Sequence, residues 1–249
     1  MRRTINLIKK YAVYIIKYLF VLIGKDWKDF YSWFLNKIEK KNDFSIIKSQ
    51  GRKYGFYSLE TGNKDLKFLV KNGLKNHHKF LDYGCGYGRT AIPVIKFLDK
   101  NRYVGIDLSK ERIRIAREYL KDQKLEEKQP TFSVSYNKRL KDILGNQKFD
   151  CIFIYTVIVH NPFKEVKKIL NEAKYYLKPD GNIFVDYWRP RPGEEFQSVK
   201  DYRLKKELIE SFLLNNGFIF EDLDDFISYQ PNKKASKYHR MLRLSLNNE

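Results

Sequence analysis

The sequence is poor in the residues that build disulfide scaffolds and structural metal sites. Its 249 residues include only two cysteines, Cys85 and Cys151, and four histidines. Two cysteines cannot hold a disulfide-rich fold together, and their scarcity favours a reducing compartment such as the cytoplasm. The cysteines and histidines also lack the paired spacing of zinc ligands, so no metal site is expected.

The sequence has little uninterrupted apolar character. Its most apolar segment, residues 5–23, is broken by three lysines, and the longest unbroken stretch runs only from Tyr18 to Gly24. A helix that crosses a bilayer needs about 20 apolar residues, so a transmembrane helix is not predicted. No small-residue cleavage site follows Ile23, which argues against a cleaved signal peptide.

Acidic residues are in the minority, and the basic excess is unevenly placed. The chain carries 49 Lys+Arg and 30 Asp+Glu, for a formal net charge of +19. The first 80 residues hold 18 of the basic and 6 of the acidic residues, so the later part is an ordinary, mildly basic domain. Hydrophobic residues make up 43% of the chain, which indicates a packed core rather than disorder.

The N-terminal segment is predicted to form a basic amphipathic helix over about residues 4–23. On a helical wheel its basic residues share one third of the circumference, and its apolar residues lie opposite. One interpretation is an interfacial helix on an anionic membrane surface. The other is a helix packed on its own domain with its lysines in solvent. A second helix, over 27–40, is expected to cover the main domain. We predict a helical extension or lid over 1–75 and one domain over 76–249.

From Lys79 onward, short apolar strands alternate with helical segments. This alternation implies a parallel sheet with helices on both faces, and such sheets bind ligands beyond the carboxyl ends of their strands. Asn161 is expected to cap the third helix, and Pro179-Asp180-Gly181 to end it with a turn. The strands are expected over 80–83, 102–106, 132–135, 149–155 and 182–187, and the helices over 89–98, 109–120 and 163–177.

A glycine-rich loop, Gly84-Cys85-Gly86-Tyr87-Gly88, directly follows the first expected strand. Its G-x-G-x-G pattern allows positive φ angles and lets a ligand lie against bare backbone. Asp107 ends the next strand, where a carboxylate can accept two hydrogen bonds from a ribose diol. Asp82 places a second carboxylate in the strand that leads into the loop.

This combination resembles the class I S-adenosylmethionine-dependent methyltransferases. The resemblance implies an enzyme that uses S-adenosylmethionine as cofactor. It also implies an α/β fold with a Rossmann-like, seven-stranded, mostly parallel sheet, helices on both faces and an antiparallel last strand, here following the N-terminal helical extension. A helix over 204–216 and strands over 218–223 and 240–246 fit the end of that fold. The motifs that carry the resemblance are 80–89, 104–109, 149–160 and 177–181.

The resemblance also implies roles for residues of this chain. The glycine loop would support the methionine moiety, Asp82 its amino end and Asp107 the ribose hydroxyls. Asn137 stands where the family often has an acidic residue that contacts the adenine amine, and Cys85 is expected only to pack. The expected cofactor-binding residues are Asp82, Tyr83, Gly84, Cys85, Gly86, Gly88, Asp107, Leu108, Asn137 and Tyr155.

The methyl acceptor is expected to meet residues that follow the fourth and fifth strands. His160 is either a catalytic base, since an imidazole takes up protons near neutral pH, or a residue that caps the following helix or packs there without catalysis. The segment 187–193 either binds an anionic acceptor through its arginines or is a solvated, proline-stiffened loop. Basic residues over 233–240 would extend the same rim. The candidate acceptor contacts are Tyr54, Tyr57, Thr156, Trp188, Arg189 and Arg191.

The favoured function is therefore in-line methyl transfer to an anionic small-molecule, lipid or sugar acceptor. The protein would be cytoplasmic, with residues 1–24 as candidate contacts to the inner face of an anionic membrane. One alternative, motivated by the net charge, is an RNA- or ribosome-associated methyltransferase, although no RNA-binding motif is visible. The other alternative is a catalytically silent, cofactor-binding partner protein.

Overall fold

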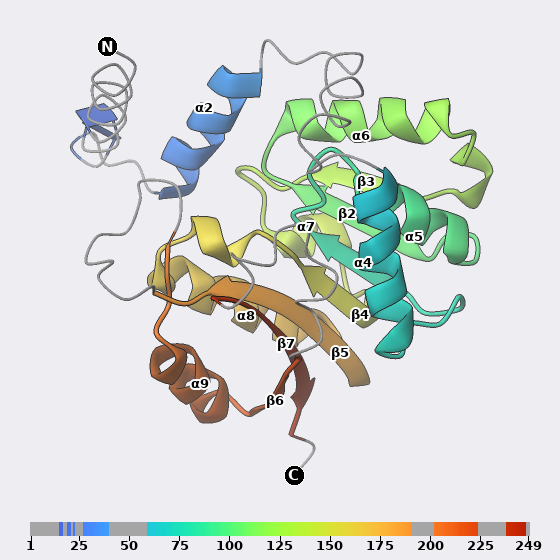
Figure 1. Cartoon of the computed structure of the whole chain (residues 1–249). Coiled ribbons are helices and arrows are strands. Elements are labelled where there is room, and N and C mark those ends of the chain that lie inside the picture. The colour runs from blue at the N-terminus through green and yellow to red at the C-terminus, as the bar shows by residue number, and fades with distance from the viewer. Residues whose placement is uncertain are drawn as a thin grey trace.

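The computed structural model describes residues 15–16, 19–20, 22, 27–39, 59–190, 202–223 and 238–247. A central sheet lies between two groups of helices (Figure 1). Several predictions fall outside the described residues. These are most of the basic helix over 4–23, Tyr54 and Tyr57, Arg191, and the basic residues over 233–237.

The sheet has seven strands in the order β3-β2-β1-β4-β5-β7-β6. β7 is antiparallel to both of its neighbours, and the other pairings are parallel. The predicted Rossmann-like sheet with an antiparallel last strand is therefore confirmed. The strands are β1 (Phe80–Tyr83), β2 (Tyr103–Asp107), β3 (Thr131–Val134), β4 (Phe149–Ile154), β5 (Leu177–Trp188), β6 (Phe218–Asp222) and β7 (His239–Leu246).

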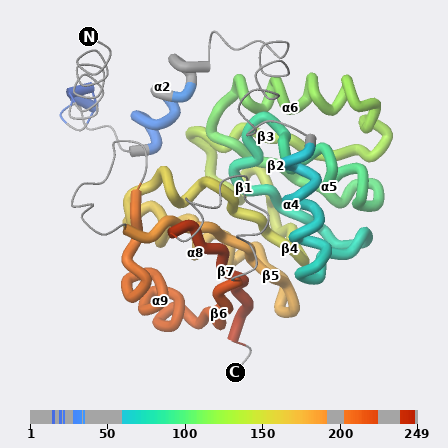
Figure 2. The backbone as a smooth tube through the Cα atoms, viewed as in Figure 1, coloured from blue at the N-terminus to red at the C-terminus, as the bar shows by residue number. Residues whose placement is uncertain are grey.

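The strands bury side chains on both faces, which explains their continuous apolar sequences. Successive residues of β4 point to opposite faces: Phe153 joins a core with α4, α5 and α6, and Ile152 joins a core with α7, α8 and α9. Figure 2 follows the two helical layers along the backbone. The helices are α4 (Leu59–Lys71), α5 (Ala91–Phe97), α6 (Lys110–Asp122), α7 (Leu140–Leu144), α8 (Phe163–Tyr176) and α9 (Lys206–Asn215).

Two local predictions around α8 were wrong. Asn161 does not cap the helix: Pro162 is the N-cap residue, and the Asn161 side-chain nitrogen donates to the Val157 carbonyl at 2.8 Å. The expected turn at 179–181 lies inside β5, which begins at Leu177. The pairing of β4 with β5 shifts register just beyond Leu177, and a Cβ at Gly181 would come within 2.8 Å of the Leu177 side chain. Glycine therefore avoids a displacement of Leu177 at this irregularity.

Helix α2 (Trp27–Glu39) packs on the domain, as expected for a covering helix. Phe30 and Leu35 are buried, and the Tyr136 hydroxyl, just beyond β3, donates to Asp29 Oδ1 at 3.0 Å. Within the described residues, no helix combines the length and hydropathy that a membrane span requires.

Helix α4 shares its core with the sheet, although it precedes the predicted domain start at residue 76. Phe68 is fully buried and meets Phe184 of β5 edge to face, with ring centroids 5.8 Å apart. The boundary between residues 75 and 76 stays a prediction.

We expect Phe68→Ala to lower the free energy of unfolding by about 3–5 kcal/mol, because it leaves a cavity between α4 and β5. Urea unfolding of the full chain measures this loss. Val70→Ala, at an exposed position of the same helix, is the matched control and should change stability by about 0.5 kcal/mol or less. A loss below about 1 kcal/mol for Phe68→Ala would mean that α4 is not an integral part of the domain.

Candidate functional site

A cavity of about 650 Å³ lies at the edge of the sheet where the parallel strands end. Its walls come from the segments after β1, β2, β4 and β5, and α2 contributes Lys28, Tyr31 and Leu35. This is the switch point of the sheet, because the chain leaves β1 for β2 on one side and reaches β4 on the other. The volume suits a cofactor-sized ligand.

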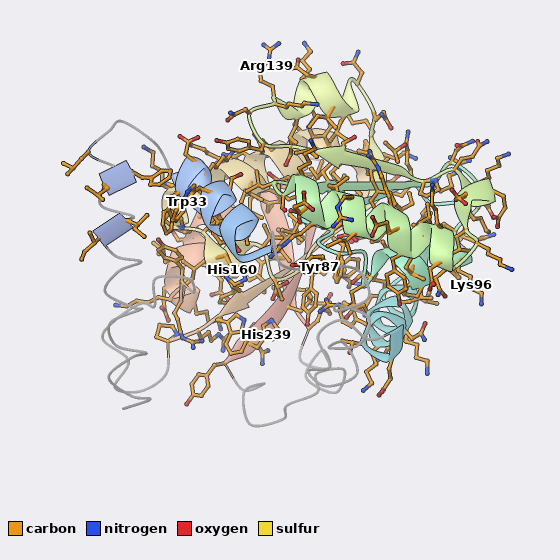
Figure 3. All side chains as sticks on the ribbon, turned by 90° about the horizontal axis from the view of Figure 1, so that it is seen from above. Trp33, Tyr87, Lys96, Arg139, His160 and His239 are labelled. Carbon is orange, nitrogen blue, oxygen red and sulfur yellow. The ribbon has the colours of Figure 1, made fainter. Side chains whose placement is uncertain are left out.

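Most of the predicted site residues line this cavity. Figure 3 shows His160, Tyr87 and His239 lying inward of Lys96 and Arg139, which lie at the periphery. The predicted residues that line the cavity are Asp82, Tyr83, Gly84, Cys85, Gly86, Asp107, Leu108, Tyr155, Thr156, His160 and Trp188.

The glycine loop presents bare backbone to the cavity at Gly86. Its φ is +56°, and a Cβ there would have no heavy atom within 4 Å. Gly84 and Cys85 donate their backbone N–H groups to the Ile106 carbonyl, at 2.8 and 3.0 Å, and so tie the loop to β2. Gly88 does not line the cavity: a Cβ there would lie 3.3 Å from Ala116, so this glycine serves the packing of the loop on α6.

Asp107 joins the glycine loop to the start of α6. Its side chain is 5% exposed, and its two carboxylate oxygens accept from Ser109 N at 2.8 Å and Gly86 N at 3.0 Å. The Arg112 guanidinium lies 4.0 Å away. Ser109 is the N-cap of α6, as predicted, and accepts from Arg112 N at 3.2 Å. The carboxylate is thus oriented before any ligand arrives.

Asp82 is buried beneath the glycine loop. The Tyr103 hydroxyl donates to Asp82 Oδ2 at 2.8 Å. Burial raises the pKa of Asp82 to about 7, against the opposing effects of this hydrogen bond and the Arg89 guanidinium. Burial also raises the pKa of the Cys85 thiol well above its usual value, as suits a packing residue.

Arg89 is a cavity residue that the sequence prediction missed. Its guanidinium lies 3.2 Å from Asp65 Oδ2 of α4 and 4.8 Å from the centre of the Tyr155 ring. Asp65 also accepts from the Thr90 hydroxyl at 2.7 Å. Its position directly after the glycine loop is the sequence feature that could have identified Arg89 as a cavity residue. Arg112, Arg203 and His239 also line the cavity and were missed.

The ends of β4, β5 and β7 meet on the other side of the cavity. Asp186 accepts from Thr156 N at 2.6 Å through Oδ1, and its Oδ2 lies 2.6 Å from His239 Nε2. Thr156 is held at a φ of +57°, which is rare for a threonine. Trp188 stacks on His239, with ring centroids 4.6 Å apart, and the Arg203 guanidinium lies 5.0 Å from the Trp188 ring centre.

His160 lies in a 3₁₀ turn, Ile158–His160, rather than in α8. Its ring stacks on Tyr31 of α2 with centroids 5.9 Å apart, and it lines the cavity. It does not cap α8, which has no side-chain cap. The packing interpretation is thus supported by a contact, and the catalytic one stays a prediction.

Besides Gly88, two predicted residues lie away from the cavity lining. Arg189, directly after β5, lies 2.9 Å from Asp222 of β6, which also pairs with Arg240 of β7 at 2.7 Å. Because β7 lies between β5 and β6, Arg189 links the end of β5 to β6 across β7. Asn137 is exposed in a turn with a φ of +54°, because β3 ends at Val134. Ser135 and Lys138 line the cavity instead.

Comparison with known proteins shows the family to which the chain belongs. Residues 74–244 match the model of a methyltransferase-domain family, and the chain belongs to that family. The resemblance to the S-adenosylmethionine-dependent methyltransferases is therefore confirmed. The predicted cofactor, S-adenosylmethionine, is confirmed at the level of the family.

Relatives with curated descriptions are similar over part of their length. The ubiquinone biosynthesis O-methyltransferase of Pelagibacter ubique is 30% identical over 129 residues, which are 52% of this chain and 50% of that protein. The release factor glutamine methyltransferase of Flavobacterium psychrophilum is 27% identical over 179 residues, 70% of this chain and 57% of that protein. The chain thus spans about half the length of the curated relatives it matches.

The fold is shared with solved structures. Magnesium protoporphyrin IX methyltransferase from Synechocystis PCC 6803, solved with bound S-adenosylmethionine, superposes with a TM-score of 0.56 at 19% identity. The match covers 93% of this chain and 95% of that one. At this identity the likeness concerns the fold alone.

The raised pKa of Asp82 predicts a pH-dependent cost to stability. The folded carboxyl keeps its proton up to about pH 7, whereas the unfolded one releases it near 3.8, so the native state binds more protons between these values. Asp82 therefore lowers stability as pH rises through that window.

We expect Asp82→Asn to become more stable relative to the wild type, by on the order of 2–3 kcal/mol, between pH 5 and pH 8. Tyr103 can still donate to the amide oxygen of the variant. Urea unfolding at both pH values measures the change, with Asp180→Asn as an exposed control. An equal difference at the two pH values would contradict the buried, raised-pKa carboxyl.

Proposed function

We propose that this protein transfers a methyl group from S-adenosylmethionine to a small, anionic acceptor. The observation that carries the proposal is the bare backbone of Gly86 facing a cavity that Asp107 also lines. The Gly86 N–H and the Asp107 carboxylate are joined by a 3.0 Å hydrogen bond, so the loop and the acid are held as one unit. Membership of the methyltransferase-domain family supports this function.

The residues of the cavity fit the proposed cofactor. The open space at Gly86 accommodates a ligand against backbone. Asp82 can accept a hydrogen bond from the ammonium of a methionine moiety, and Arg89 can donate to its carboxylate. Asp107 would accept hydrogen bonds from ribose hydroxyls, and Leu108 would contact the adenine. When bound, S-adenosylmethionine supplies an activated methyl group on a sulfonium. The protein would bind and orient both reactants and exclude water.

We assign the side of the cavity near Trp188 to the methyl acceptor and call it the acceptor end. Cationic side chains there support the proposed anionic acceptor. Arg203 lies over Trp188, and Lys28 reaches the cavity from α2. A guanidinium binds carboxylate or phosphate as a two-pronged donor. Arg203 thereby takes the role that the sequence assigned to Arg189. A small-molecule acceptor also agrees with the similarity to an O-methyltransferase of ubiquinone biosynthesis.

We expect the full chain to bind S-adenosylmethionine in a calorimeter, and Asp107→Ala to reduce that affinity at least tenfold by removing the ribose acceptor. Asp180→Ala, which removes an exposed carboxylate, should bind as the wild type does. With a labelled methyl group and a cell extract, the label should enter small molecules retained by an anion exchanger.

The two readouts separate the parts of this proposal. Absence of cofactor binding would contradict the methyltransferase function itself. Binding with transfer of the label into RNA would contradict the small-molecule acceptor and favour the RNA-associated alternative.

Exposed apolar residues near the N-terminus support a second proposal, docking on an anionic membrane surface. Ile15, Leu19 and Leu22 are 60%, 50% and 62% exposed. Phe20, in contrast, meets Phe30 and Trp33 of α2, with ring centroids 5.8 and 5.5 Å apart. One side of this segment thus packs on α2 while an apolar stripe faces outward. The basic residues over 2–17 supply the charge that anionic lipids attract.

We expect the full chain to float with vesicles that contain phosphatidylglycerol at low salt, and to be released by high salt. Leu19→Glu combined with Leu22→Glu should abolish flotation, because the stripe becomes charged. Leu214→Glu, at a 64% exposed position of α9, is the control and should float as before. Equal flotation of all three proteins would contradict docking through this stripe.

A further inference from the structure

The pair formed by Asp186 and His239 has no role in holding the cofactor as described above. Both residues are buried, at 0% and 3% exposure, and His239 lines the cavity. The pair is brought together by antiparallel pairing, in which Trp188 of β5 lies opposite His239 of β7 and Asp186 lies opposite Met241. The two side chains therefore share one face of the sheet, two residues apart along β5.

Asp186 orients the imidazole. One carboxylate oxygen accepts from the backbone of Thr156, and the other lies 2.6 Å from His239 Nε2. A carboxylate only accepts hydrogen bonds, so it favours the imidazole form that carries its proton on Nε2. Nδ1 is then the nitrogen with the basic lone pair. The unusual φ of Thr156 lies at the same junction, and strained backbone of this kind clusters at functional sites.

Two aromatic rings lie parallel to the His239 imidazole. Trp188 lies face to face with it at 4.6 Å and an interplanar angle of 14°, and Tyr155 at 6.1 Å and 11°. Aromatic faces attract a cation, and the Asp186 carboxylate does so more strongly. These three neighbours can accommodate the imidazolium that proton transfer would form.

We infer that His239 is the catalytic base of methyl transfer, with Asp186 as its positioning residue, and that the acceptor atom is a hydroxyl oxygen. This inference rests on the proposed function. The acceptor O–H bond breaks and its proton moves to His239 Nδ1, while the oxygen forms a bond to the methyl carbon. The C–S bond breaks with its electron pair kept by sulfur, and the imidazolium then returns the proton to solvent.

The first test follows the imidazole itself by nitrogen NMR on the full chain with S-adenosylhomocysteine. We expect a neutral His239 with its proton on Nε2 at pH 8, which becomes doubly protonated on acidification. In Asp186→Asn the amide oxygen can still accept from Thr156 while its NH₂ group donates to Nε2, so the ring proton should move to Nδ1. A ring that stays doubly protonated through pH 9 would be a fixed ion pair and would overturn the inference.

The second test measures methyl transfer to 4-hydroxybenzoate and 4-aminobenzoate, two anions that differ in the acceptor atom. We expect transfer to the hydroxyl, a loss of about 10²- to 10⁴-fold in His239→Gln and Asp186→Asn, and unchanged cofactor affinity. The acid-side fall of the rate should vanish in His239→Gln. The charged and titratable groups around the pair include Arg89, Arg203, Tyr155 and Asp65.

The methyl-transfer test has a control variant and several outcomes that would contradict the inference. His77→Gln, an exposed histidine away from the cavity, is the control and should retain full activity. Full activity in His239→Gln, transfer only to the amine, or cofactor binding without transfer to either probe would each overturn the inference. Failure to bind S-adenosylmethionine would refute the proposed function instead. The nitrogen spectrum would still show whether Asp186 sets the position of the ring proton on His239.

Discussion

The site depends on the hydrogen bonds that Asp107 makes to two backbone N–H groups. One is Gly86 in the loop after β1, and the other is Ser109 at the start of α6. These contacts close the glycine loop onto the neighbouring strand, and the bonds from Gly84 and Cys85 to Ile106 reinforce them. The cradle is therefore preformed, and a ligand that binds there need not supply the free energy of ordering the loop.

Charges are distributed unequally around the same cavity. Towards β1 and β2 the carboxylates of Asp82 and Asp107 are buried, and each is hydrogen-bonded by a neighbour. Towards β5 and β7 the polar groups are stacked on aromatic rings, and Arg203 and His239 both pack against the Trp188 ring. The proposed division into a cofactor end and an acceptor end follows this difference in chemistry.

Local sequence patterns predicted the features that depend on neighbouring residues. The strands, the glycine loop, Asp107 and the Ser109 cap follow from short motifs whose geometry is fixed within a few positions of the chain. Features that depend on distant pairing were not predictable. Arg189 was placed in the site because its sequence neighbours are aromatic and basic, yet the structure pairs it with Asp222. Asp186 and His239 are separated by 52 intervening residues, and only the register of β5 with β7 brings them together.

The antiparallel direction of β7 has a topological consequence. The parallel strands β1, β2, β4 and β5 reach the cavity with their last residues, and the loops that follow them complete its walls. β7 reaches it with its first residue, His239, so the chain enters this strand where it leaves the others. Insertions before β7 would therefore reshape the acceptor end, whereas insertions after Leu246 would fall at the opposite edge of the sheet. Changes of sequence that alter the acceptor end through β7 therefore fall in the segment that precedes this strand.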